Sequence, residues 1–361
     1  GEGRCPSRSP GYFDQEKGGS RVSEPKRINL ALQGGGAHGA FTWGVLDRFL
    51  DDEGIEIAAI SGTSAGALNG AAVKSGLLEG GRDGARANLD WLWEQMGAVQ
   101  DMRMPAWMTG LVPQPDAFSG AMEFSPPYFW ADAMSRMVSP YAYGPFYNNP
   151  LERIVEQFHY DTVCAAEGPA FFVGATNVHS GKIRVFHGAE ISTDALLASA
   201  CLPTLFKAVE IDGAHYWDGG YTGNPALFPL FEGDLPGDIL IVHINPLERD
   251  EVPKSPQEIQ NRINEISFNS SLLRELRAIH FVQRLLADGA LREGTMKRLY
   301  VHMIADDALM RELSVATKLV PTPYTLHRLR DAGFAAAERF LTAHRDDLGQ
   351  GSTVDMAAMY G

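Results

Sequence analysis

The chain alternates between short apolar runs and longer stretches in which apolar residues recur every three or four positions. The runs Arg27–Gln33, Ile55–Ile60 and Asp238–Ile244 have the length and composition of strands, and the last is apolar almost without interruption. Helical spacing follows the first two runs, in Ala40–Leu50 and Ala65–Leu78. Because a continuous apolar run is typical of a strand covered on both faces, we predict a three-layer α/β fold with a mainly parallel central sheet.

Two hairpins are predicted in the middle of the chain. The first pairs Pro169–Asn177 with Lys182–His187. The second places Val209–Ile211 and Tyr216–Trp217 on either side of a turn at residues 212–213, where aspartate is followed by glycine.

Beyond residue 246 the pattern is mainly helical. Ser255 and Glu258 form a capping box that predicts the start of a helix, with a proline at the first helical position. The apolar stripe of this helix consists of Ile259, Ile263, Ile266, Leu273, Leu276 and Ile279. A strand at Arg298–Ile304 and a last helix at Thr325–Ala343 complete a C-terminal extension, residues 246–361.

Two segments lack regular periodicity. Residues 1–25 are rich in glycine, serine, proline and charge, which predicts a disordered tail. Residues 101–147 concentrate methionine and aromatic side chains between prolines, so we interpret them as an insertion. Such side chains suit a lid or an acyl-chain pocket, and a loop packed over the core fits the same composition equally well.

Composition excludes several classes of function. The net charge of −14 and the isoelectric point near 5.2 argue against nucleic-acid binding and against adsorption to anionic lipid by charge alone. Cys5, Cys164 and Cys201 have neither a pairing pattern nor metal-ligand spacing, which fits a reducing compartment. Since no run approaches the ~20 apolar residues of a membrane-spanning helix, we expect a cytoplasmic protein that could contact membranes peripherally.

The first candidate for chemistry is Ser64, in the sequence Gly62–Gly66. This segment lies where a predicted strand turns sharply into a predicted helix, which is the context of a nucleophile elbow. Gly62 and Gly66 let the backbone fold back on itself, and the positive end of the following helix points at the hydroxyl. A turn without chemistry has the same local pattern, so the neighbouring motifs decide.

A glycine-rich loop, Gly34–Gly39, precedes the elbow between another strand and helix. It bares several backbone N–H groups, and in acyl transfer such a loop forms an oxyanion hole worth roughly 3 to 4 kcal/mol per donor. The candidate donors are Gly34, Gly35, Gly36 and Gly39. The same glycines fit a dinucleotide fingerprint, but that site needs an acidic residue where the second strand here ends in serine and threonine.

The third motif is Asp218, followed by Gly219 and Gly220 at the end of the second predicted hairpin. An aspartate before two glycines is usually a turn residue. In the company of the other two motifs it becomes a candidate general base.

Together the three motifs resemble the patatin-like phospholipase family. The family pattern is a glycine-rich oxyanion loop, here Gly34–Gly39, a serine elbow, here Gly62–Gly66, and an Asp-Gly-Gly, here Asp218–Gly220. The resemblance covers about residues 27–245 and implies a catalytic domain at 26–245. It also implies a lipid acyl hydrolase of the phospholipase A or lysophospholipase type, with a Ser64–Asp218 dyad and no catalytic histidine. His38 stands where plant members usually have arginine.

Several alternatives stay open. An α/β-hydrolase-type esterase, thioesterase or polyester hydrolase would use Ser64, Asp218 and either His243 or His302. A lipid-binding scaffold without turnover would keep the apolar pocket alone. No cofactor is expected, and no metal, since the histidines and acidic residues lack ligand spacing. The expected partners are an acyl-ester lipid and, transiently, a lipid surface, and the C-terminal extension could provide a homodimer face.

Overall fold

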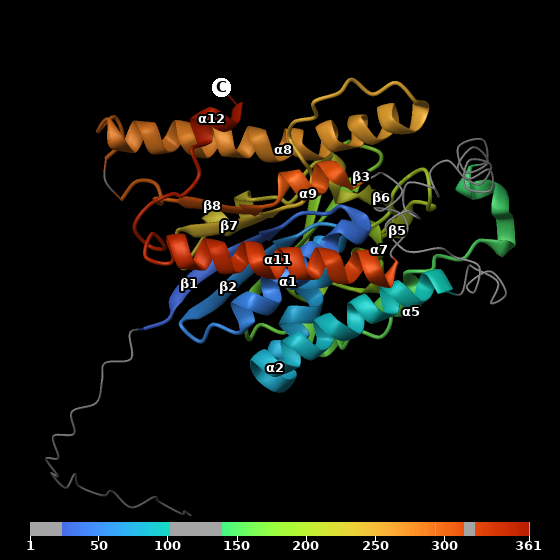
Figure 1. Cartoon of the computed structure of the whole chain (residues 1–361). Coiled ribbons are helices and arrows are strands. Elements are labelled where there is room, and N and C mark those ends of the chain that lie inside the picture. The colour runs from blue at the N-terminus through green and yellow to red at the C-terminus, as the bar shows by residue number, and fades with distance from the viewer. Residues whose placement is uncertain (1–23, 102–138, 293, 314–321, 361) are drawn as a thin grey trace, which may run out of the picture.

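The computed structural model describes residues 24–101, 139–292, 294–313 and 322–360. Almost all of the predicted N-terminal tail and most of the predicted 101–147 insertion lie outside these residues. The described chain forms one central sheet with helices packed on both of its faces (Figure 1). This is the three-layer α/β architecture that the sequence predicts.

The described residues form an eight-stranded sheet that is mainly parallel. Its strands are β1 (Lys26–Leu32), β2 (Ile55–Gly62), β3 (Ala170–Asn177), β4 (Ile183–His187), β5 (Val209–Ile211), β6 (Ala214–Asp218), β7 (Asp238–His243) and β8 (Tyr300–Ala305). Neighbouring strands pair in the order β5, β6, β3, β2, β1, β7, β8, and β4 pairs with β3. All pairs from β3 to β8 along this order are parallel, whereas β4, β5 and β6 pair antiparallel. Both predicted hairpins and the predicted C-terminal strand are therefore confirmed.

The helices cover the two faces unequally. The α-helices are α1 (Gly39–Leu50), α2 (Ala65–Asp101), α5 (Glu152–Val155), α6 (Tyr160–Val163), α7 (Thr193–Ser199), α8 (Pro256–Ala287), α9 (Asp307–Glu312), α11 (Pro323–His344) and α12 (Met356–Tyr360). Short 3-10 turns are η1 (Gly36–His38), η3 (Pro140–Phe146), η4 (Gly188–Glu190), η5 (Gly219–Tyr221) and η6 (Phe228–Phe231). In Figure 1, α1, α2 and α11 lie on one face of the sheet, and α8 and α12 lie on the other.

Each face of the sheet has its own apolar core. Ile28, Leu30 and Leu32 of β1 pack into the larger cluster with α1, α2 and α11, while Ala31 packs into the smaller cluster beneath α8. This alternation follows from the strand geometry, in which successive side chains point to opposite faces. Every residue of β7 is buried, as its continuous apolar run predicts.

The apolar stripe predicted for α8 is correct in its second half and wrong in its first. Leu276 and Ile279 are buried in the core beneath the helix, but Ile259, Ile263 and Ile266 are 43%, 53% and 54% exposed. The inward side of the first half carries buried polar residues instead, among them Glu265 and Asn269. The reason is that this half of α8 lies over the loop that follows β7 and contacts it mainly through polar groups, as where Asn269 donates to the carbonyls of Asn245 and Pro246.

Candidate active site

The glycine-rich loop and the serine elbow lie side by side because they follow neighbouring parallel strands. In the β1–β2 ladder Leu32 pairs with Gly62, so both strands end at the same level of the sheet. The loops then touch: a Cβ atom at Gly34 would lie 2.7 Å from Cβ of Ser64. A Cβ atom at Gly66 would lie 2.1 Å from the carbonyl oxygen of Leu32. Glycine at these positions is therefore a condition for bringing the two motifs together.

Ser64 has the backbone of a nucleophile elbow. Its φ angle is 54°, a left-handed conformation that is uncommon for a residue with a side chain. Its N–H donates to Oγ of Ser199 at 2.9 Å, and that hydroxyl in turn donates to the carbonyl of Gly174 at 2.7 Å. The next residue, Ala65, begins α2, so the serine lies at the positive end of a long helix.

Asp218 reaches Ser64 because β2 and β6 meet end to end along one edge of β3. Residues 172–173 of β3 pair with both β2 and β4, and residues 175–176 pair with both β4 and β6. A strand has two edges, and β4 occupies one of them, so β2 and β6 share the other. Since β2 is parallel and β6 antiparallel to β3, the two strands run toward each other, and only Gly174 separates their last paired positions.

The environment of Asp218 suits a base. The side chain is buried, and this burial raises the pKa of the carboxyl to about 7, although hydrogen bonds from the Gly220 N–H and the Ser64 side chain act in the opposite direction. The Gly220 N–H donates to Oδ1 at 2.8 Å. Both motif glycines are also packed too closely for a side chain, with a Cβ atom at Gly219 2.2 Å from the Gly174 carbonyl oxygen.

The four candidate oxyanion donors do not have equal roles in the structure. The N–H of Gly34 donates to Oδ1 of Asn224 at 2.6 Å, and the N–H of Gly39 caps the η1 turn by donating to the carbonyls of Ala37 and Gly36. Within the described parts of the chain, nothing accepts a hydrogen bond from the N–H of Gly35 or Gly36. These two groups are the donors that remain for a substrate oxygen.

Two asparagines behind the loop were not found from the sequence. Asn224 and Asn245 are fully buried and both donate to the carbonyl of Gly34, at 3.3 Å and 2.7 Å respectively. Gln33 joins them, because its Oε1 accepts from the Asn245 side chain at 3.2 Å. The one local signal was the polar residue Asn224, which follows the last glycine of the third motif by four positions.

The histidines of the alternative triad lie elsewhere. His302 is buried in β8, with Nε2 3.0 Å from Oδ1 of Asp238 and Nδ1 3.2 Å from Oγ1 of Thr353. His243 is buried at the end of β7, where burial lowers its pKa and Asp307 is the charged group acting against that shift. Among the described residues, no contact joins either ring to Ser64 or Asp218.

Two other side chains with reactive groups, His38 and Cys201, are buried near the site. His38 is fully buried in the η1 turn of the glycine loop. Cys201 is buried with its thiol against the carbonyl of Lys207, and burial raises its pKa to about 12, which removes it as a nucleophile near neutral pH.

Comparison with known proteins identifies the family of the chain. A family model described as "Patatin-like phospholipase" matches residues 30–231, more than half of the chain. No curated protein matches. Among solved structures, the chain is similar to VipD from Legionella pneumophila, with 14% identity, a TM-score of 0.41 and coverage of 89% of this chain and 67% of that one. It is also similar to the ExoU–SpcU complex of the type III secretion system of Pseudomonas aeruginosa, with 16% identity, a TM-score of 0.28 and coverage of 93% and 74%.

Proposed function

Because the chain belongs to the patatin-like phospholipase family, we propose that it is a lipid acyl hydrolase in which Ser64 is the nucleophile and Asp218 is the general base. The observation that carries this proposal is the meeting of β2 and β6, which brings a strained serine to a buried aspartate. Two unpaired N–H groups beside the serine, those of Gly35 and Gly36 within the described chain, support the assignment of an oxyanion hole.

The proposed reaction has two halves. In the first, the Asp218 carboxylate takes the hydroxyl proton of Ser64 as Oγ attacks the ester carbonyl carbon, and the N–H groups of Gly35 and Gly36 bind the oxyanion. The intermediate collapses by breaking the bond to the alcohol, which leaves with the proton from Asp218. In the second half, water gives its proton to Asp218, attacks the acyl-enzyme, and releases the fatty acid while the proton returns to Ser64.

The Asp218 carboxylate can act as the general base without a histidine because burial has raised its basicity. At its ordinary pKa near 3.8 an aspartate is a poor base at neutral pH, whereas the buried Asp218, with a pKa of about 7, is matched to the task. The hydrogen bond from the Gly220 N–H holds Oδ1 in place. It lowers the pKa of Asp218 by less than burial raises it.

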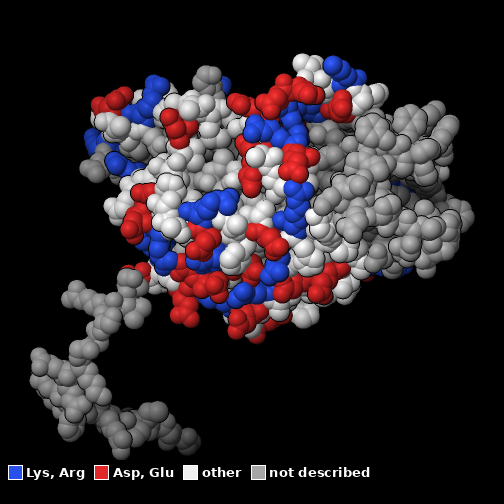
Figure 2. Space-filling view, viewed as in Figure 1, with Lys and Arg blue, Asp and Glu red and all other residues white. Residues whose placement is uncertain are grey.

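We also propose that the enzyme contacts a lipid surface transiently. No helix among the described residues is long and apolar enough to cross a membrane. On the face shown in Figure 2, acidic and basic side chains are interspersed, so this face offers no large patch of one sign to attract a charged lipid surface. We propose a cytoplasmic enzyme that contacts membranes transiently and forms a homodimer through its C-terminal extension.

The test uses an active-site fluorophosphonate and a panel of phospholipids, lysophospholipids, neutral esters and thioesters, with products identified by mass spectrometry. Ser64→Ala should abolish both labelling and hydrolysis while the protein stays folded. Ser75→Ala is the matched control, since it also removes a buried hydroxyl from α2, far along the helix from the elbow. Labelling that persists in Ser64→Ala would place the nucleophile elsewhere, and a chain that binds lipids without releasing products would be a scaffold.

A further inference from the structure

Both polar groups of Gly34 are held by side chains from distant parts of the chain. Its N–H donates to Oδ1 of Asn224 at 2.6 Å, and its carbonyl accepts from Nδ2 of Asn245 at 2.7 Å and from Nδ2 of Asn224 at 3.3 Å. All three residues are buried, so the contacts are shielded from water. Side chains about two hundred positions away thus hold the two peptides on either side of the Gly34 Cα, through the N–H of one and the carbonyl of the other.

The hydrogen bonds to the Gly34 carbonyl determine the direction of the Gly35 N–H. The carbonyl of Gly34 and the N–H of Gly35 belong to one planar trans peptide, so they point in opposite directions. Two amide donors on the carbonyl therefore turn the Gly35 N–H away from the asparagines. The donors also polarise this peptide, which strengthens the hydrogen bond that its N–H can make.

We infer that Asn245 and Asn224 are positioning residues that aim the Gly35 N–H at the substrate oxygen and withdraw the Gly34 N–H from it. This inference rests on the proposed function, since it assigns a role within the same oxyanion hole. Neither asparagine touches substrate. They act by fixing the peptide between Gly34 and Gly35. Because both of these residues are glycines, the peptide could rotate more freely without the asparagines.

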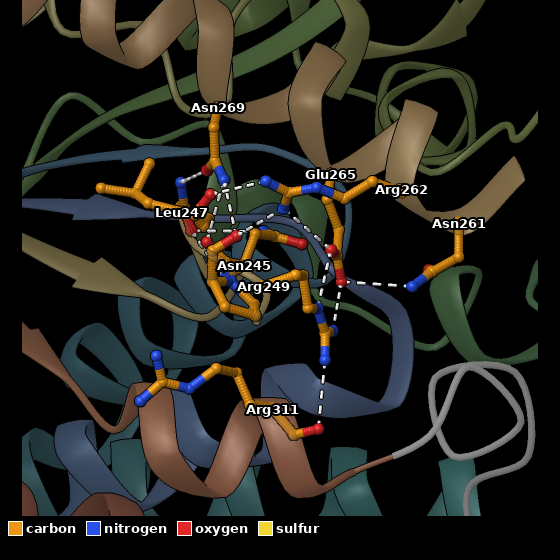
Figure 3. A network of polar contacts seen from close by, with 10 residues as sticks. Asn245, Leu247, Arg249, Asn261, Arg262, Glu265, Asn269 and Arg311 are labelled. Atoms are coloured by element: carbon orange, nitrogen blue, oxygen red, sulfur yellow. Dashed lines mark hydrogen bonds and ion pairs between the residues drawn. The ribbon is translucent and has the colours of Figure 1, made fainter. Parts of the chain in front are cut away.

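Asn245 is itself held by α8. Asn269 of this helix donates to the backbone carbonyls of Asn245 and Pro246 at 3.0 Å and 3.3 Å. Farther along the same loop, Arg249 forms a bidentate ion pair with buried Glu265 of α8 at 2.6 Å and 3.2 Å. Figure 3 shows the contacts between the helix and the loop as one connected set.

A second arginine completes this support. Arg262 contacts Glu265 at 3.3 Å and donates to the carbonyl of Leu247 at 2.8 Å, so Glu265 is shared between two guanidinium groups (Figure 3). The polar inner side of the first half of α8, which the sequence pattern did not predict, thus has a use: it fixes the loop that presents Asn245 to Gly34.

The test compares Asn245→Asp and Asn245→Ala with Asn261→Ala in the full chain. Aspartate keeps the shape of asparagine but replaces the donor with a carboxylate that repels the Gly34 carbonyl. We expect kcat on a soluble ester to fall about 100-fold with KM changed less than threefold, as for a misplaced oxyanion donor. Asn245→Ala should lose about tenfold. Asn261→Ala removes an asparagine whose Nδ2 contacts Glu265 at 3.2 Å, and it should keep wild-type kcat.

A crystal structure of each folded variant gives a readout that does not depend on activity. The Gly34 carbonyl should be rotated from its wild-type direction in Asn245→Asp and unchanged in Asn261→Ala. An unchanged peptide, a loss confined to KM, or failure of both Asn245 variants to fold would overturn the inference. A wild-type chain without esterase activity would refute the proposed function, while the orientation of the peptide would still decide about the asparagines.

Discussion

The sheet buries an aspartate near each end of its strands, and the two have different partners. Asp218, at the end of β6, receives hydrogen bonds from the Gly220 N–H and the Ser64 side chain. Asp238, the first residue of β7, accepts from the Gly349 N–H at 2.7 Å and contacts His302 at 3.0 Å. His302 also contacts Thr353, so this second group has the order acid, histidine, hydroxyl of a hydrolase triad.

The backbone around each hydroxyl distinguishes the two groups. Near Thr353 three backbone donors are engaged: its own N–H and that of Val354 donate to Val301, and that of Gly351 donates to Asp347. Beside Ser64 the N–H groups of Gly35 and Gly36 have no acceptor within the described chain. A triad-like order of side chains is therefore weaker evidence for catalysis than unpaired donors next to a strained nucleophile. The hydrogen bonds of Asp238 and His302 hold residues 349–353 against the sheet.

The largest difference between the two aspartates should appear in turnover. Asp218→Asn removes the proposed base, and we expect kcat to fall by about 10²–10⁴-fold, the range for losing a general base. Asp238→Asn should keep kcat within twofold. Steady-state kinetics on a soluble ester measure both. Equal losses in two folded variants would mean that the Asp238 group takes part in catalysis.

The second prediction concerns the donors. In Gly35→Ala the new Cβ would lie 2.9 Å from Cδ1 of Ile244, so either this side chain or the loop must shift, although the φ of 171° at this position is open to any residue. We expect kcat to fall about 100-fold with little change in KM, because the donors act on charge that develops in the transition state. Gly351→Ala, near Thr353, has no atom within 4 Å of the new Cβ and serves as the control. A change in KM alone would make the loop a pocket wall.

The third prediction is a pH profile. Asp218 must be ionised to accept a proton, and its pKa is about 7, so kcat/KM should rise with pH and be half-maximal near pH 7. Between pH 8 and pH 6 the rate should fall about tenfold, as the fraction of carboxylate falls. The same rise should be seen in Asp238→Asn. A half-maximal rate below pH 5 would show that the base has an ordinary carboxyl pKa.

The smallest effect is expected at the other end of the sheet. Thr353→Val removes one hydrogen bond from His302 and should lower the free energy of unfolding by about 0.5–1.5 kcal/mol, with kcat unchanged. Urea unfolding followed by tryptophan fluorescence measures the change. A fall in kcat without a fall in stability would contradict a purely structural role.

The parts of the candidate site that depend on neighbouring residues could be predicted from the sequence, whereas those that depend on contacts between distant residues could not. Ser64, Asp218 and the glycine loop are each recognisable from a few neighbouring residues, and the fold class follows from strand and helix periodicity. Asn245 was missed because its partner Gly34 is 211 positions away. The first half of α8 was misjudged because apolar spacing alone does not say which side of a helix meets polar loops.

The buried carboxyl of Asp218 also links protons to the stability of the fold. Its pKa is raised in the folded chain, so the folded state holds this proton more tightly than the unfolded state, where the ordinary value is 3.8. The contribution to stability is therefore full below about pH 4 and is lost as pH rises toward 7, by ~1.4 kcal/mol per unit of pKa difference. Asp218→Asn, which cannot ionise, should consequently unfold at a higher temperature than the wild type at pH 8, with a smaller difference at pH 5. A difference that is independent of pH would assign the proton to another group. This one contribution to stability is thus smallest under the conditions in which the proposed base is ready to act.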